Sequence, residues 1–208
     1  MPGTRPGMTA FVAALAFLHA GMWALHAQTS SSRSAAELMD AVMWNREPIG
    51  GPFALIDHTG NARTDADFRG KLMLVYFGFT YCPDVCPTDL QTIGLALDKL
   101  GAAAEKVQPL FITVDPERDT VEQLAPYMPL FHPRLVGLTG AAEAIRSAAA
   151  EYRVYYAKVP TKGDDYTVDH SGFIYLMGID GKYLGFFPPG TASDVIAQTI
   201  AEQLNPEK

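Results

Sequence analysis

Only two of the 208 residues are cysteine, and they lie close together at Cys82 and Cys86. Two cysteines are too few for a disulfide-stapled scaffold or for a zinc site made of cysteines alone. Basic residues are also scarce, since 16 Lys and Arg face 23 Asp and Glu, which gives a formal net charge of −7. A nucleic-acid-binding protein needs a basic surface for the phosphates, so this balance argues against nucleic acid as a partner.

The composition also excludes a disordered chain. Hydrophobic residues make up 48% and charged residues 19% of the sequence, which allows a sizeable core. A length of 208 residues suits one ordinary domain, or one domain with a short accessory segment. No internal repeat divides the sequence, so we expect a single folded domain.

Charge is almost absent from the N-terminus, where Arg5 is the only charged side chain before Arg33 and Met8–Ala27 has none. A positive residue followed by an apolar stretch is the pattern of an export signal. The stretch has about 20 residues, just long enough to span a bilayer, although its two histidines make it a poor membrane helix. We expect residues 1–27 to be a signal peptide or a membrane anchor, and the rest of the chain to be exported to the periplasm.

Residues 28–47 begin with the polar run Gln28–Ser34, and the irregular segment Asn45–Pro52, rich in proline and glycine, marks the edge of the domain, so we expect residues 28–47 to be a linker. From residue 48 to 205, strand and helix patterns alternate, which predicts a three-layer α/β domain. The predicted strands are Phe53–Ile56, Leu72–Phe77, Pro109–Val114, Leu135–Leu138, Phe173–Met177 and Tyr183–Phe187. The predicted helices are one that follows the cysteines, with an apolar stripe from Leu90 to Leu100, and Val121–Tyr127, Ala141–Tyr152 and Val195–Leu204.

The cysteine pair lies where a buried strand is predicted to lead into a helix. The pattern places Cys82 in the turn and Cys86 among the first helical residues, next to Pro87, which suits an early helix position. The N-terminus of a helix has free N–H groups and partial positive charge, and both stabilise a thiolate. A thiolate is both a nucleophile and a soft metal ligand, so the position indicates chemistry of one of these two kinds.

The spacing of three intervening residues allows either a disulfide or a shared metal ion. A purely stabilising disulfide is disfavoured, because closing so short a loop contributes little. A thioredoxin-type redox pair normally has two intervening residues, whereas Cys82 and Cys86 have three. The spacing therefore favours metal binding by Cys82 and Cys86 over redox chemistry, and both remain open. No histidine follows either cysteine directly, which excludes a c-type haem, and no arginine lies beside them as a peroxiredoxin-like peroxidase needs.

A metal ion would need a third ligand, and three histidines follow residue 27. His58 lies in a polar turn and His132 lies before a proline, so both are interpreted as loop residues. His170 lies just before the predicted Phe173–Met177 strand, and in a thioredoxin-like fold that junction faces the first turn of the cysteine helix. We therefore select His170 as the third ligand, with a purely structural histidine as the alternative.

Two thiolates and one imidazole form a small, soft ligand set. Thiolates select Cu(I) and zinc, and imidazole binds copper well. Zinc with three such ligands and a water would be a catalytic type of site that needs a general base. Asp169 is the nearest acid, but it adjoins His170, and neighbouring residues of an extended chain point to opposite faces. We therefore expect one copper ion per chain, as Cu(I) or Cu(II).

Three motifs resemble the signatures of the Sco/SenC family of copper chaperones: YCPDVCP (Tyr81–Pro87), VDPERDT (Val114–Thr120) and VDHSGFIYL (Val168–Leu176). Their order and spacing match the family as well. The segments Ile49–Asp57 and Asp67–Thr80 resemble the opening part of the family's domain. The likeness covers nearly all of the chain after the predicted linker.

The resemblance implies a thioredoxin-like fold with an added β-hairpin and an N-terminal extension, in a domain held outside the cytoplasm, often by a membrane anchor. It implies one copper bound by Cys82, Cys86 and His170, and a role in assembling the binuclear copper centre of cytochrome c oxidase. The partner would be the copper-binding oxidase subunit, with other copper carriers or thiol reductants as further partners. The role would be metal donor, thiol–disulfide reductant of that subunit, or both, rather than turnover enzyme. Asp115 and Asp119 match acidic positions of the middle motif, with helix capping and loop structure as the simpler interpretation.

Overall fold

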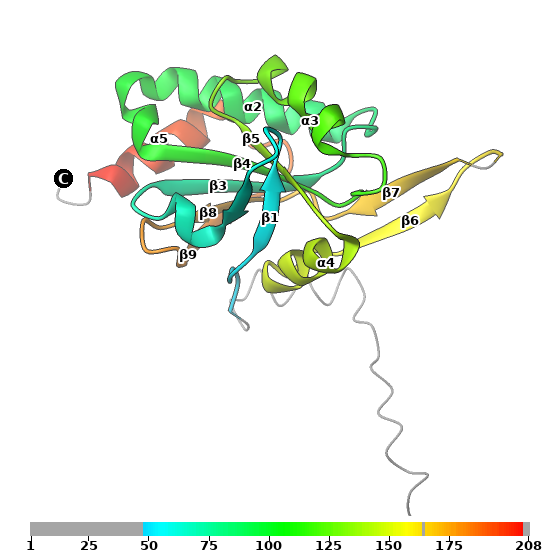
Figure 1. Cartoon of the computed structure of the whole chain (residues 1–208). Helices are drawn as coiled ribbons and strands as arrows, with labels where there is room; N and C mark the ends of the chain where they lie inside the picture. Colours follow the sequence, from blue (N-terminus) through cyan, green and yellow to red (C-terminus); the bar gives the residue numbers. More distant parts are fainter. Residues whose placement is uncertain (1–47, 164, 206–208) are drawn as a thin grey trace, which may run out of the picture. The chain divides into compact units, whose positions relative to one another are not determined.

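A computed structural model of the chain describes residues 48–163 and 165–205, and Figure 1 shows how their elements are arranged. The predicted signal or anchor (residues 1–27) and the predicted linker (residues 28–47) lie outside the described residues. Within the described part of the chain, no helix is both long enough and apolar enough to cross a membrane.

The centre of the fold is a seven-stranded mixed sheet. Its strands are β1 (Ala54–Asp57), β2 (Ala62–Thr64), β3 (Leu72–Gly78), β4 (Val107–Thr113), β5 (Val136–Thr139), β8 (Ile174–Met177) and β9 (Tyr183–Phe187). The spatial order is β2-β1-β5-β4-β3-β8-β9, with β3, β4 and β5 parallel and the outer pairs antiparallel. Every residue of β3 is buried, as its continuous apolar run predicts for a strand covered on both faces.

Helices cover both faces of this sheet. The α-helices are α2 (Val85–Leu100), α3 (Val121–Tyr127), α4 (Ala142–Glu151) and α5 (Ser193–Leu204), and the short 3₁₀ helices are η1 (Asp65–Phe68), η2 (Gly101–Lys106) and η3 (Met128–Leu130). In Figure 1, α2 and α3 lie on one side of the sheet and α4 lies on the other, and α5 packs against α2. The prediction of a three-layer α/β domain is confirmed, with most element ends within two residues of the predicted ones.

The side chains of β3 point alternately to the two faces of the sheet, so the strand contributes to both layers of the core. Tyr76 packs toward Phe111 of β4, with 6.5 Å between their ring centroids. The next residue, Phe77, faces the other side and packs on Tyr152 at the end of α4, at 5.3 Å. Successive strand residues point to opposite faces, so β3 builds both halves of the core and directs the Tyr76 side chain toward the start of α2.

The residue pattern placed neither the short strand β2 nor a separate two-stranded sheet. It consists of β6 (Tyr156–Pro160) and β7 (Tyr166–His170), which pair antiparallel and extend away from the larger sheet in Figure 1. The added hairpin that the family resemblance implied is therefore present. Its register pairs Tyr156 with His170, so the strand continues through His170. His170 is thus the last residue of β7, just before the segment that leads into β8.

Candidate metal centre

The two cysteines occupy the junction that the sequence predicted. Cys82 lies in the loop between β3 and α2, and Cys86 is the second residue of α2, followed by Pro87. The backbone N–H of Cys86 points at the Cys82 sulfur at 3.5 Å. A free N–H of the first helical turn therefore faces the sulfur of Cys82, as expected for a thiolate stabilised by a helix N-terminus.

The end of β3 must lack a side chain for the cysteines to reach this position. A Cβ atom on Gly78 would lie 2.9 Å from the Cys86 sulfur and 3.1 Å from the Phe111 ring. Both distances are shorter than ordinary van der Waals contact. Glycine at this position therefore allows α2 to start directly against the sheet, with Cys86 fully buried.

His170 reaches the cysteines from the far end of the chain. Its Nε2 lies 3.3 Å from the Cys86 sulfur, and its Nδ1 lies 3.1 Å from the carbonyl oxygen of Ser171. Since the carbonyl only accepts, Nδ1 is the donor, and the lone pair of the neutral ring is on Nε2, facing the thiols. The rings of Tyr76 and Phe79 contact the imidazole edge-on, at centroid distances of 6.3 Å and 5.9 Å.

Cys82, Cys86 and His170 together form a compact set of donor atoms. The two sulfurs and a ring nitrogen all lie within 4.8 Å of one another, and no other group of three or more His, Cys, Asp or Glu in the described residues is placed to share a metal ion. Cys86 is buried, whereas Cys82 and His170 are half-buried. The set is therefore closed on the side of the core and accessible on the side of Cys82. Two soft sulfurs and an imidazole suit copper.

The two thiols share one proton unequally. The Cys86 thiol donates a hydrogen bond to the Cys82 sulfur and so holds the pKa of Cys82 well below its usual value, against the opposing effect of burial. The same hydrogen bond and stronger burial raise the pKa of Cys86. In the metal-free protein the thiolate therefore lies on Cys82, the more accessible sulfur.

A buried carboxyl group beside the centre was missed by sequence reasoning. Asp89 is buried on α2, and its Oδ2 has no hydrogen-bond partner among the described residues. Burial raises its pKa, against the influence of Tyr76, the backbone of Gly190 and His170. Asp89 lies three residues after Cys86, and residues at this spacing share one face of a helix. That spacing is the signal that would have identified it.

Asp115 and Asp119 organise the loops behind the cysteines. The Asp119 carboxylate accepts hydrogen bonds from the Thr80 N–H at 3.0 Å, the Thr80 hydroxyl at 2.6 Å and the Thr113 hydroxyl at 2.6 Å. Both aspartates are fully buried. Helix α3 is capped instead by Thr120, whose hydroxyl accepts from Gln123 N. The loop-structure interpretation therefore fits both aspartates, and the helix-capping interpretation fits neither.

The other two histidines of the described residues, His58 and His132, lie in loops and stay apart from the thiols. His58 Nδ1 accepts a hydrogen bond from the Gly137 N–H at 3.1 Å, and His132 Nδ1 accepts one from the Arg134 N–H at 3.1 Å. His58 is thus a hydrogen-bonded, half-buried residue rather than the solvated one expected from the sequence. Asp169, which the zinc alternative would need as a base, is exposed.

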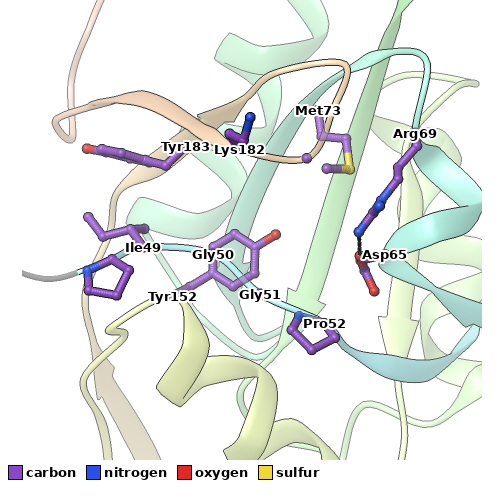
Figure 2. Close-up of a pocket in the computed structure, with 12 residues that line it drawn as sticks. Ile49, Gly50, Gly51, Pro52, Asp65, Arg69, Met73, Tyr152, Lys182 and Tyr183 are labelled. Carbon is purple, nitrogen blue, oxygen red and sulfur yellow. Dashed lines mark hydrogen bonds and ion pairs between the residues drawn. The ribbon is translucent and has the colours of Figure 1, made fainter.

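A hollow of about 410 Å³ lies at the opposite end of β3 from the cysteines, and Figure 2 shows its lining. Met73, near the start of β3, contributes to it, about 16 Å along the strand from Gly78. The two cationic side chains that line the hollow have carboxylate partners. Arg69 pairs with Asp65 at 3.1 Å, and Lys182 pairs with Asp180 at 2.8 Å. The hollow is therefore separate from the sulfur–imidazole site.

The sequence profile of the SCO1/SenC family matches residues 42–205. The mitochondrial SCO1 homolog of Homo sapiens is 45% identical over 161 residues, which cover 76% of this chain and 54% of that protein. Protein sco1 of Schizosaccharomyces pombe is 45% identical over 159 residues, covering 74% of this chain and 60% of that protein. The chain thus corresponds to little more than half the length of these two relatives.

Solved structures resemble the fold over the same region. Copper-bound ScoI of Arabidopsis thaliana has a TM-score of 0.72 and 43% identity, covering 76% of this chain and 99% of that one. Copper-bound ScoI of Bradyrhizobium japonicum has a TM-score of 0.71 and 45% identity, covering 74% and 99%. BsSco is described as having a disulfide switch and as a member of the Sco family of cytochrome c oxidase assembly proteins. It has a TM-score of 0.58 and 26% identity, covering 76% of this chain and 95% of that one. On the profile match and these identities, the chain belongs to the SCO1/SenC family.

Proposed function

We propose that this chain binds one copper ion through Cys82, Cys86 and His170 and delivers it during assembly of the copper centre of cytochrome c oxidase. The observation that carries the proposal is the convergence of two sulfurs and one imidazole nitrogen within 4.8 Å. Two relatives with more than 40% identity have been solved with copper bound. A member of the same family, BsSco, is described as an oxidase assembly protein.

The donor set suits a carrier more than a permanent metal site. Two thiolates satisfy Cu(I), which accepts few ligands, and the imidazole adds the nitrogen that Cu(II) prefers. Cys82 is half-buried, whereas Cys86 is fully buried. An incoming ligand from the oxidase subunit would therefore displace Cys82 first, and copper would pass by stepwise exchange of ligands.

A second function, reduction of the target's cysteines, is favoured by the lowered pKa of Cys82. The Cys82 thiolate would attack a disulfide of the oxidase subunit and form a mixed disulfide, releasing one thiolate of the target. Cys86, after losing its proton, would then attack the Cys82 sulfur and release the second thiolate. The target gains two electrons and two protons, one proton from Cys86 and one from the solvent, and Cys82 and Cys86 are left as a disulfide.

The location and organisation of the chain are part of the same proposal. We place residues 48–205 in the periplasm, with residues 1–27 as a cleaved signal or as an anchor in the inner membrane and residues 28–47 as a linker. The uncharged stretch Met8–Ala27 supports export. Cell fractionation with N-terminal sequencing tests it, since a cytosolic product that keeps Met1 would contradict export.

One variant separates the donor from the reductant. His170→Ala removes a copper ligand but leaves both thiols, so a reductant keeps its chemistry and a donor is impaired. We expect cells that carry only His170→Ala to lose oxidase activity at limiting copper, while the purified variant still shows two titratable thiols. Normal oxidase activity in those cells would favour the reductant, and loss of activity in Cys82→Ser cells is expected in either case.

A further inference from the structure

Arg118 lies where the hairpin and the cysteine loop meet. Its Nη1 donates to the carbonyl oxygen of Tyr166 on β7 at 2.9 Å, and its guanidinium carbon lies 3.8 Å from the centre of the Tyr166 ring. The same guanidinium lies 4.8 Å from the ring centre of Tyr81 and 5.9 Å from that of Phe79, both in the segment that leads to Cys82. One side chain therefore contacts both segments that bring ligands to the centre.

A buried carboxylate holds this guanidinium in position. Arg118 Nε is bonded to the carboxylate of Asp115, which is fully buried. The Tyr166 hydroxyl donates to the other oxygen of the same carboxylate at 2.8 Å. The Arg118 side chain is only 19% exposed. An arginine that is largely buried and bonded to a buried carboxylate is held more firmly than the arginine of an exposed surface ion pair.

The hairpin needs such an attachment because it pairs with no strand of the seven-stranded sheet. Tyr166 and His170 are the first and last residues of β7, four positions apart. Residues four apart on a strand point to the same face. The Arg118 contact at Tyr166 therefore acts on the face of β7 that carries the imidazole.

We propose that Arg118 is a positioning residue for the metal centre: by holding Tyr166 of the hairpin against the cysteine loop, it sets the distance of the His170 imidazole from the two thiols. The inference rests on the proposed copper site. Since the thiolates alone suffice for Cu(I) and nitrogen matters more for Cu(II), Arg118 acts mainly on Cu(II) binding and so on the preference between oxidation states.

The test compares copper binding by the full chain and its Arg118→Lys variant, because lysine keeps a charge beside Asp115 but lacks the fork that reaches the hairpin. Competition titrations with Cu(I) and Cu(II) are combined with the visible absorption of the Cu(II)–thiolate complex. We expect Cu(II) affinity to fall by about tenfold, the usual effect of losing a residue that orients a ligand. Cu(I) affinity should change much less, and the Cu(II) spectrum should move toward that of His170→Ala.

Glu117→Gln is the matched control. Glu117 is adjacent to Arg118, and its pair with Lys158 at 2.6 Å also joins this loop to the hairpin, but both side chains are exposed. Exposed ion pairs contribute little to stability. This variant should therefore bind Cu(I) and Cu(II) as tightly as the unaltered chain does. Cu(II) binding by Arg118→Lys equal to that of Glu117→Gln would overturn the proposal.

A double variant separates positioning from general damage to the fold. If Arg118 acts through His170, adding Arg118→Lys to His170→Ala causes no further loss of Cu(II) affinity. A full additional tenfold loss would overturn the inference.

A second variant serves if urea titrations show that Arg118→Lys is strongly destabilised. Tyr166→Leu removes the contact from the hairpin side and must give the same shift in the Cu(II) spectrum. If His170→Ala itself leaves Cu(II) binding intact, the proposed copper site is wrong, whereas a loss confined to His170→Ala refutes only the role of Arg118.

Discussion

At the scale of single residues, the centre depends on a sulfur pair whose protonation is unequal. Cys82 is half-buried and carries the thiolate because the thiol of Cys86, which is fully buried, donates a hydrogen bond to its sulfur. From the sequence, the helix N-terminus is expected to stabilise a thiolate in this pair, without distinction between the two cysteines. Geometry distinguishes them, since only Cys82 faces the free N–H of residue 86. Which thiol is more buried is a property of packing, and the spacing of the cysteines does not reveal it.

This inequality predicts selective alkylation in the metal-free, reduced protein. A cysteine with an ordinary pKa of about 8.5 is almost fully protonated at pH 6, whereas the lowered pKa of Cys82 keeps its thiolate there. We expect iodoacetamide to modify Cys82 at a rate nearly constant between pH 8 and pH 6, and to spare Cys86 until the chain unfolds. Mass spectrometry of timed samples checks this, and a rate at Cys82 that drops tenfold per pH unit would contradict it.

Gly78 gives a second prediction at this scale. Gly78→Ala places a methyl group 2.9 Å from the Cys86 sulfur and 2.9 Å from the Tyr76 ring. Overpacking of this kind in a core reduces the free energy of unfolding by about 1–3 kcal/mol, and we expect weaker copper binding because Cys86 must move. Urea unfolding measures the first effect. The control is Gly185→Ala on β9, where a Cβ meets nothing within 4 Å, and equal stability of the two variants would disprove the argument.

At the scale of elements, the parts that bury apolar residues were predictable and the hairpin was not. The apolar run of β3 and the stripe of α2 predicted both elements. Strand β6 is largely exposed and β7 has one fully buried residue, Val168, so neither shows the alternation by which a strand is recognised. His170 was identified by its motif, and its place at the end of a strand depends on pairing with Tyr156 across the hairpin.

The contact between the β4–α3 loop and the β3–α2 loop can be tested at Asp119. Asp119→Ala removes the acceptor of three hydrogen bonds and leaves the Thr80 N–H and the buried Thr113 hydroxyl without that partner. We expect the free energy of unfolding to fall by about 1–3 kcal/mol, the typical effect of leaving a buried polar group unsatisfied. Urea titration provides the value. Asp98→Ala, at a side chain that is 70% exposed, should have little effect, and equal losses at both sites would argue against the role of this contact.

At the scale of the whole molecule, metal binding and redox chemistry compete for the same two sulfurs. A Cys82–Cys86 disulfide offers no thiolate to copper, and bound copper shields both sulfurs from attack on a partner. We expect oxidation of the full chain to abolish copper loading, and loading to protect both cysteines from alkylation. Copper stoichiometry before and after reduction measures the first effect. An oxidised chain that still takes up one copper would contradict the account.

The most direct test of the central claim is X-ray absorption at the copper edge of the reduced, loaded chain, with Cu(I) and with Cu(II). We expect sulfur scatterers in both states and a nitrogen scatterer from imidazole in the Cu(II) form. The nitrogen contribution should disappear in His170→Ala, and the sulfur contribution in the Cys82→Ser, Cys86→Ser double variant. A first shell of oxygen and nitrogen alone, or a spectrum that the double variant leaves unchanged, would show that copper binds elsewhere.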